Sequence, residues 1–250
     1  MLQTRPFALS IAGFDPSGGA GLLADIKTFE SHQVYGLGVL TANTIQTEDS
    51  VESIRWEGRN YVLQQLEVLL KRYQPRVIKV GIVQSGEELL HYLQIIKQYV
   101  PRAFIVWDPV LSSSTHFEFT KVLGTPILDA ILNQIDLITP NYLEIDQLIP
   151  NTNTPQEKAQ SLRSSCAVLL KGGHCTESKA IDQLYLSDKT HSFYPQCIYP
   201  TTKHGTGCVL SSAIASQMAL NYPLDQAVLK AKKYVEQLLA SNSTLLAYHV

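Results

Sequence analysis

The fold is decided by one stretch of the sequence, VIKVGIVQSGEELLHYLQIIKQYVPRAFIVWDPV, which runs from Val77 to Val110. The first residues of this stretch, 77–83, form a short apolar run of the kind typical of a buried strand. Residues 86–99 then carry apolar side chains at helical spacing, and residues 103–110 return to a strand pattern. A strand, a helix and a second strand in this order predict a βαβ unit, in which a helix joins two parallel strands.

The same alternation continues on both sides of this stretch. The remaining strand patterns cover residues 7–13, 39–46, 136–139 and 166–173. The remaining helical patterns cover residues 21–32, 60–73, 120–133, 142–148, 156–165, 205–220 and 224–246. Residues 180–188 and 191–199 indicate a late antiparallel pair. We therefore expect an α/β fold, with a mostly parallel central sheet, helices on both faces and a few antiparallel edge strands.

The first helical pattern also predicts which of its faces is buried. Leu22, Leu23, Ile26 and Phe29 lie on one helical stripe, so we expect this stripe to pack against the sheet. No linker, low-complexity tract or internal repeat interrupts the sequence. We therefore expect residues 1–250 to form a single domain.

The composition excludes several classes of partner. Twenty basic and 22 acidic residues give the 250-residue chain a formal net charge of −2. Proteins that bind the nucleic acid backbone usually carry a basic surplus, so we expect no nucleic acid partner. No apolar run is long enough to span a bilayer, and the first residues lack the pattern of a signal peptide, so we expect no membrane association.

The cysteines indicate a reducing compartment. The four of them are widely spaced and form no C-x-x-C pair: Cys166, Cys175, Cys197 and Cys208. This spacing is typical of free thiols, so we expect a cytoplasmic protein. A zinc site at His174 and Cys175 would lack a second pair of ligands, and we do not expect one.

A glycine-rich segment, AGFDPSGGAG, follows the first strand at residues 12–21. Ligands of parallel sheets bind outside the carboxyl ends of the strands, so this position suits a binding loop. The segment contains G-x-G-x-x-A, at Gly19, Gly21 and Ala24, but its additional polar residues argue against a dinucleotide fingerprint. It also lacks the Gly-Lys-Ser/Thr of a Walker loop. A backbone-lined pocket floor and a simple turn both remain open here.

A second glycine-rich segment, KHGTGCVLSSAIAS, leads into a helix at residues 203–216. A helix that starts on glycines gathers backbone N–H groups around an anion, and phosphate is the obvious ligand. Cys208 lies in the first turn, where a carboxylate base would be expected. A third segment, LLKGGH at residues 169–174, carries Lys171 at a strand end, where a lysine can reach a phosphate as a point charge.

Two carboxylates also follow strands. Asp108 ends the apolar run FIVW and precedes Pro109, and Glu144 lies three residues after Asn141, just beyond the strand at 136–139. Hard oxygen ligands at two strand ends suit Mg²⁺. Taken singly, Asp108 is equally typical of a turn and Glu144 of a solvated helix position.

Four motifs together resemble a known family. SIAGFDPSGGAGLLADIKTF, TPNYLE, LLKGGH and HGTGC occur in the order and at the spacing of the hydroxymethylpyrimidine/phosphomethylpyrimidine kinases of thiamine biosynthesis, in the ribokinase-like superfamily. The resemblance extends from about residue 7 to about residue 240. It implies ATP-dependent phosphorylation of the hydroxymethyl group of 4-amino-5-hydroxymethyl-2-methylpyrimidine with Mg²⁺, and a homodimer.

The resemblance also implies roles for individual residues. Gln46 would hydrogen-bond the aminopyrimidine, and the rest of its pocket would come from Gly13, Ala20, Asp25, Ile82 and Val110. Asp108 and Glu144 would organise magnesium and its waters, and Lys171 and Asn141 would bind ATP. The anion hole would consist of Gly205, Thr206 and Gly207. Cys208 would occupy the position of the general base.

Cys208 can fill that position in two ways. A helix N-terminus lowers the pKa of a thiol, so we expect the thiolate to be favoured. The residue would then act as a weak base, which is sufficient for the loose transition state of phosphoryl transfer. The alternative is that it only shapes the pocket around the hydroxymethyl group.

The sequence departs from the family pattern in three places. DPVLSSSTHFEF, at residues 108–119, lacks the usual Lys-Ser-Gly; TIQTEDSV keeps Gln46 without the following asparagine; and no glycine-rich tail precedes LLAYHV. These departures leave open whether the monophosphate is a second substrate. They also leave open a pyridoxal or pyridoxine kinase, and a catalytically weakened sensor that binds a pyrimidine or a nucleotide.

Overall fold

A computed structural model describes residues 4–112, 117, 119, 124–174, 180–197 and 202–249. Their strands form one nine-stranded sheet in the order β3-β2-β1-β4-β5-β6-β7-β8-β9. The strands are β1 (Phe7–Phe14), β2 (Tyr35–Gln46), β3 (Val51–Trp56), β4 (Val77–Val80), β5 (Phe104–Trp107), β6 (Leu137–Ile138), β7 (Ala167–Leu170), β8 (Asp182–Tyr185) and β9 (Thr190–Phe193). The helices are α1 (Gly21–Ser31), α2 (Arg59–Arg72), α3 (Gly86–Tyr99), α4 (Thr125–Leu132), α5 (Tyr142–Leu148), α6 (Pro155–Leu162), α7 (Thr206–Ala219) and α8 (Leu224–Leu239).

The six central strands, from β2 to β7 in the sheet order, are parallel. β1 pairs with β2 and β4, and the parallel pairing continues through β5, β6 and β7. The antiparallel strands β3, β8 and β9 lie at the two edges. This confirms the predicted α/β fold with a mostly parallel sheet. The parallel arrangement also brings the carboxyl ends of these six strands to the same end of the sheet.

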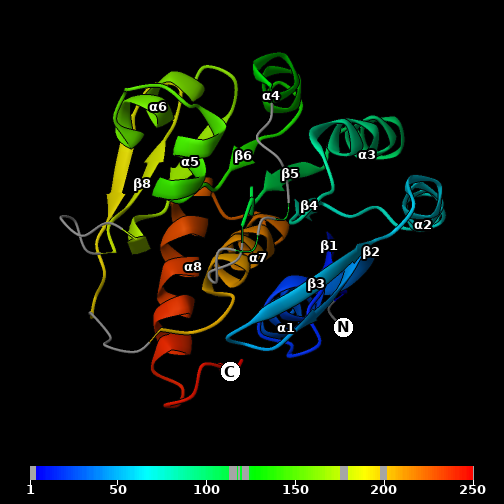
Figure 1. The fold of residues 1–250 in the computed structure, drawn as a ribbon, viewed down its shortest axis with the longest axis horizontal. Helices are drawn as coiled ribbons and strands as arrows, with labels where there is room; N and C mark the ends of the chain where they lie inside the picture. The colour runs from blue at the N-terminus through cyan, green and yellow to red at the C-terminus, as the bar shows by residue number, and fades with distance from the viewer. Residues whose placement is uncertain are drawn as a thin grey trace.

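Helices cover both faces of the sheet. One apolar core lies between the sheet and α2, α3, α4, α5 and α6, and a second lies between the sheet and α1, α7 and α8. Figure 1 shows α2, α3 and α4 on one side of β4 and β5, and α1 and α7 on the other. Side chains alternate along β4, so that Ile78 belongs to the first core while Lys79 points toward α1 and α7.

Three local predictions need correction. Strand β3 was missed because three of its six side chains are exposed and the other three are only half-buried, so it lacks a buried apolar face. Leu22, Ile26 and Phe29 of the predicted stripe do pack on Gly36 and Gly38 of β2. The fully buried residues of α1 are nevertheless Ala24, Asp25, Thr28 and Phe29, whereas Leu22, Leu23 and Ile26 are only partly buried. Helix α8 ends at Leu239 rather than near residue 246.

The early end of helix α8 has a local cause. The Asn242 side chain accepts hydrogen bonds from the backbone N–H and the hydroxyl of Thr244, which is a turn that competes with helix continuation. By contrast, the helical pattern at residues 60–73 matches α2, in which Val62, Leu66 and Leu70 are buried while Leu69 and Tyr73 of the same apolar face are half-buried. Residues 113–116 and 118 of the serine-rich segment, residues 120–123 of the expected fourth helix, and Cys175 lie outside the described residues.

The position of β1 defines where a ligand should bind. The chain leaves β1 toward β2 on one side and later returns to β4 on the other side. Such a switch point opens a crevice outside the carboxyl end of the strand. The glycine-rich segment at residues 12–21 runs through this point.

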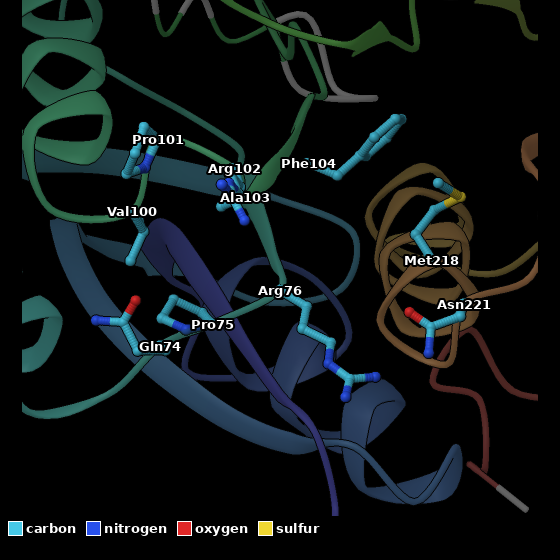
Figure 2. Close-up of a pocket in the computed structure, with 10 residues that line it drawn as sticks. All are labelled: Gln74, Pro75, Arg76, Val100, Pro101, Arg102, Ala103, Phe104, Met218 and Asn221. Atoms are coloured by element: carbon cyan, nitrogen blue, oxygen red, sulfur yellow. The ribbon is translucent and has the colours of Figure 1, made fainter.

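A cavity of about 450 Å³ lies at the opposite end of the parallel strands. Figure 2 shows its wall, which is formed by residues 74–76 before β4, residues 100–104 at the start of β5, and Met218 and Asn221 at the end of α7. Arg76 donates to the carbonyl of Ala219, which caps the carboxyl end of α7 (3.1 Å). This cavity therefore lies at the amino ends of the strands, away from the predicted site.

Every helix in the described part of the chain is too short or too polar to cross a membrane.

Candidate active site

The loop after β1 is folded around the carboxylate of Asp15. This carboxylate accepts hydrogen bonds from the backbone N–H groups of Ser17 (2.8 Å) and Ala20 (2.8 Å). Gly21, which starts α1, has a φ of 58°, and a Cβ on it would lie 2.4 Å from the carbonyl oxygen of Gly13. Only glycine fits here, because a side chain would push the two ends of the loop apart. The loop is therefore a rigid floor rather than a flexible connection.

The N-terminus of α7 meets this floor. Its N-cap residue, Gly205, has a φ of 75°, and a Cβ on it would lie 2.0 Å from the carbonyl oxygen of Gly19. The first helical hydrogen bond runs from Val209 N to Gly205 O, so the N–H groups of Thr206 and Gly207 lie ahead of the helical ladder. Such groups attract an anion, as the sequence predicted.

Lys171 supplies a positive charge at the same point. It follows β7, and its Nζ would be 3.4 Å from a Cβ placed on Gly207. The same Nζ donates to Asp108 Oδ1 (2.8 Å) and lies 3.5 Å from Glu144 Oε2. The structure therefore brings the predicted lysine, both predicted carboxylates and the predicted anion hole into one cluster.

Asp108 is fully buried and surrounded by donors. Besides Lys171, it accepts hydrogen bonds from the hydroxyls of Thr139 (3.0 Å) and Ser211 (3.1 Å). Burial alone would raise its pKa, but the charges of Lys171 and Lys79 hold the pKa below its ordinary value. Asp108 is therefore ionised at neutral pH.

Asn141 and Glu144 form a capping box at the start of α5. Asn141 Oδ1 accepts from the backbone N–H of Glu144 (2.8 Å), and Glu144 Oε2 accepts from the backbone N–H of Asn141 (2.7 Å). Burial raises the pKa of Glu144 to about 7, even though Lys171 opposes the shift. The amide nitrogen of Asn141 and the Oε1 atom of Glu144 are the parts of this pair left for a ligand.

These carboxylates do not form a metal cage by themselves. Three side chains already donate to Asp108, and among the described residues no group of three or more His, Cys, Asp or Glu side chains is arranged to bind a metal ion. Mg²⁺ commonly keeps several waters and is bound by one or two carboxylates together with substrate phosphates. The free oxygen of Glu144 beside the anion hole fits that arrangement.

Cys208 lies in the first turn of α7 and is half-buried. The backbone N–H of Gly21 lies close enough to its sulfur to act against a rise in the pKa of the thiol. Burial raises the pKa of the Cys208 thiol to about 11; Lys79 opposes this, whereas Asp108 and Asp25 add to it. The expectation of a favoured thiolate is therefore wrong, because burial and two carboxylates outweigh the cation and the N–H donor.

Most of the predicted pyrimidine pocket lies at the same edge. Gln46 ends β2, and Ala20 and Val110 follow β1 and β5; all three are partly exposed. A Cβ on Gly13 would lie 2.3 Å from Ile82 Cδ1, so these two residues are in contact.

Asp25 differs from the rest of this predicted set. Its carboxylate is fully buried and binds Lys79 Nζ at 3.0 and 2.9 Å, together with the hydroxyls of Ser10 and Ser212. Asp25 therefore lies in the core behind the glycine-rich loop at residues 12–21 and does not line the pocket.

Several residues of this site could not be placed there from the sequence. Lys79 carried a signal, because a lysine inside the apolar strand VIKV needs a buried partner. Thr139 and Ser211 carried none, since single hydroxyls are common at such positions.

The arrangement is suited to phosphoryl transfer, and the fold is that of the ribokinase-like kinases. Two solved structures resemble it. A phosphomethylpyrimidine kinase from Clostridium difficile 630 superposes with a TM-score of 0.78 at 30% identity, covering 93% of this chain and 99% of that chain. The pyridoxal kinase from Staphylococcus aureus in complex with pyridoxal gives a TM-score of 0.81 at 25% identity, covering 95% of this chain and 88% of that chain. The protein is therefore a phosphotransferase that acts on an alcohol group.

The sequence narrows this class further. The sequence model of the phosphomethylpyrimidine kinase family matches residues 15–250. A hydroxymethylpyrimidine/phosphomethylpyrimidine kinase from Aquifex aeolicus is 34% identical over 245 residues, covering 95% of this chain and 96% of that protein. The chain belongs to the phosphomethylpyrimidine kinase family.

Proposed function

We propose that the protein transfers the γ-phosphoryl group of ATP to the hydroxymethyl group of 4-amino-5-hydroxymethyl-2-methylpyrimidine, and that the resulting monophosphate is its second substrate. The observation that carries this proposal is the Lys171 ammonium beside Gly207, at the glycine-capped N-terminus of α7. A cation and free N–H groups at one point favour a transferring phosphoryl group. Family membership supports the pyrimidine as the acceptor.

The pyrimidine would lie on the floor formed by Gly13 and Ala20, between Ile82 and Val110. Gln46 would face its edge. A side-chain amide carries both a donor and an acceptor, so it can pair with a ring nitrogen and the exocyclic amine together. A pyridine ring lacks this pair of groups, and Gln46 would therefore discriminate the aminopyrimidine from a B6 vitamer.

The phosphates would be bound between Lys171 and the first turn of α7. The N–H groups of Gly205, Thr206 and Gly207 would receive the transferring group, and the Asn141 amide would donate to an ATP phosphate. Asp108 would act through Lys171, because it holds the ammonium in place (2.8 Å). Such fixed charges stabilise the transition state without reorganising during the reaction.

Magnesium would neutralise charge on the phosphate oxygens when it is bound with ATP. Glu144 would hold it through water, by the oxygen that the capping box leaves free. Cys208 would hold the hydroxymethyl group as a thiol, because burial raises its pKa to about 11.

The test is an ADP-release assay with hydroxymethylpyrimidine, its monophosphate and pyridoxal as acceptors. We expect turnover with the pyrimidines and little with pyridoxal. Preference for pyridoxal would favour the alternative that the S. aureus structure suggests. Binding of pyrimidine or nucleotide without turnover would instead identify a sensor.

A pair of variants tests the site itself. Lys171→Met should abolish most turnover, whereas Lys158→Met removes a lysine that is also buried but binds Asp146 on α5 (2.6 Å), and should keep it. Equal losses in both variants would contradict the placement of the site.

Three broader predictions accompany this proposal. We expect the whole chain to work as one domain, the protein to be a homodimer, and its compartment to be the cytoplasm. Light scattering of the purified protein measures the second of these, and a single cooperative unfolding transition would support the first.

A further inference from the structure

The two glycine-rich loops that surround the site are in direct contact. Gly205 can approach the carbonyl oxygen of Gly19 only because it has no side chain, and a Cβ on Gly205 would also lie 2.8 Å from Ala20 Cα. Any sliding of one loop against the other would therefore move the anion hole and the thiol together. The mechanism proposed above does not explain what prevents such sliding.

Asp15 links the loops through hydrogen bonds. It is almost fully buried, and the carboxylate that binds Ser17 N and Ala20 N also receives His204 Nε2 (2.9 Å). Hydrogen bonds from His204 and Ser17 keep the pKa of Asp15 below its ordinary value, despite the opposing effect of burial. An ionised carboxylate only accepts hydrogen bonds, so His204 Nε2 carries the proton and donates.

His204 is held from its other side by the C-terminal segment, residues 241–249. Its backbone N–H donates to Leu245 O (2.9 Å), and its ring packs on Gly19, where a Cβ would lie 2.6 Å from the ring. The neighbouring Lys203 is buried and donates to the backbone oxygen of Asn242 (2.6 Å) and to Asn242 Oδ1 (2.7 Å). In Figure 1 the chain ends near α1, beside the loop that it supports.

We propose that Asp15 and His204 are positioning residues that join the two glycine-rich loops into one rigid phosphate-binding unit, with residues 241–249 as its outer support. Neither residue touches the reacting atoms. They act through the alignment of Gly205–Gly207 and Cys208 with Lys171. Misplacing catalytic groups by about 1 Å is enough to cost about 10²-fold in rate. The inference rests on the proposed phosphate site at the start of α7.

The test compares His204→Gln with His204→Leu in steady-state kinetics with ATP and hydroxymethylpyrimidine. Glutamine keeps an N–H donor at about the distance of Nε2, so we expect its kcat within about threefold of wild type. Leucine fills the space without a donor, and we expect kcat about 10²-fold lower, with both KM values changed less than about threefold. Asp15→Asn should behave like His204→Leu. The double variant should lose no more than the worse single variant, because the two residues act as one unit.

His91→Leu is the matched control. His91 lies on α3, bonds the carbonyl of Glu87 in its own helix (2.6 Å), and should leave kcat unchanged. Equal activity of His204→Gln and His204→Leu would overturn the proposal, and so would additive losses in the double variant. If His204→Leu does not fold, His204→Asn replaces it, because its amide is too short to reach Asp15. An inactive wild-type protein would refute the proposed function; an active wild type with an active His204→Leu refutes only this inference.

Discussion

Replacing Lys79 with methionine should destabilise the protein by about 3–5 kcal/mol. Lys79 and Asp25 are both fully buried, with Lys79 Nζ 3.0 and 2.9 Å from the two carboxylate oxygens. Methionine has nearly the same volume but no charge, so it would leave Asp25 ionised in the core with only the Ser10 and Ser212 hydroxyls as donors. Breaking a buried pair from one side is costly because the remaining charge has lost its water and its partner.

The geometry supports this magnitude. Two unit charges 3 Å apart interact by about 5 kcal/mol at an effective dielectric constant of 20. Part of this is recovered when the structure relaxes around Asp25, which leaves about 3–5 kcal/mol. In a chain of this size each kcal/mol lowers Tm by about 2–4 °C, so we expect Tm to fall by about 6–20 °C.

The pH dependence of this loss follows from Lys79 itself. Burial would lower the pKa of Lys79, but the charge of Asp25 raises it above its ordinary value. A raised lysine pKa gives a contribution that is complete below the unfolded value of about 10.4 and is lost only as pH rises through the folded pKa. The difference between wild type and Lys79→Met should therefore be constant from about pH 6 to 9.

Thermal and urea unfolding of four variants, Lys79→Met, Asp25→Asn, their double variant and Lys158→Met, test this expectation. Lys79→Met/Asp25→Asn leaves no unpaired charge, so it should recover at least half of the loss in Lys79→Met. Lys158→Met is the control, because its partner Asp146 is half-exposed and regains water; we expect a loss of about 1 kcal/mol. A loss below about 1 kcal/mol in Lys79→Met would refute the reasoning, as would a double variant as unstable as the sum of its single variants.

The other predictions concern catalysis. Gln46→Ala should raise KM for the pyrimidine more than KM for ATP, by the equivalent of about 1–3 kcal/mol, and equal effects on both substrates would remove Gln46 from the pocket. Glu144→Gln should lower kcat and raise the magnesium concentration needed for half-maximal rate; an unchanged magnesium titration would leave Glu144 as a capping residue only. Cys208 should react slowly with iodoacetamide at pH 7 and faster up to about pH 11, because its pKa is raised by burial, and bound pyrimidine should protect it. Fast alkylation at pH 7 would show a thiolate instead. Cys208→Ser should keep most of kcat if the thiol only holds the substrate, whereas Cys208→Ala should raise KM.

The order of elements could be read from the sequence because it depends on local patterns. The apolar strands and the helical pattern at residues 60–73 are local signals, and β1, β4 and α2 form where these patterns predict them. The buried face of α1 is different, because a distant residue decides it. Asp25 turns inward to meet Lys79 on β4, and helical periodicity of apolar residues cannot report such a pair. Strand β3 was missed because it is held by backbone pairing with β2 and has no buried apolar face that the sequence could reveal.

The candidate site divides in the same way. Residues that follow strands, such as Asp108 and Lys171, were found because a parallel sheet brings strand ends to one edge. Their partners were not found, because Thr139 and Ser211 reach Asp108 from separate elements and no spacing in the sequence relates them. The pKa of Cys208 was misjudged because helix position is visible in the sequence, whereas burial and nearby carboxylates are not.

Helix α7 explains why these separate elements make one site. Most of its residues are small and it is buried over most of its length, so it has no strong apolar stripe and packs closely on several strands. Its first two turns contact four surrounding elements. Gly205 meets the β1 loop, and Gly207 meets Lys171 after β7. Ser211 donates to Asp108 after β5, and Ser212 donates to Asp25 on α1. In each of the two buried ion pairs, Lys171–Asp108 and Lys79–Asp25, the carboxylate accepts a hydrogen bond from one of these serines. Removing a charge from either ion pair would therefore disturb the same end of α7. We expect such a change to alter both the stability of the protein and the positioning of the phosphate.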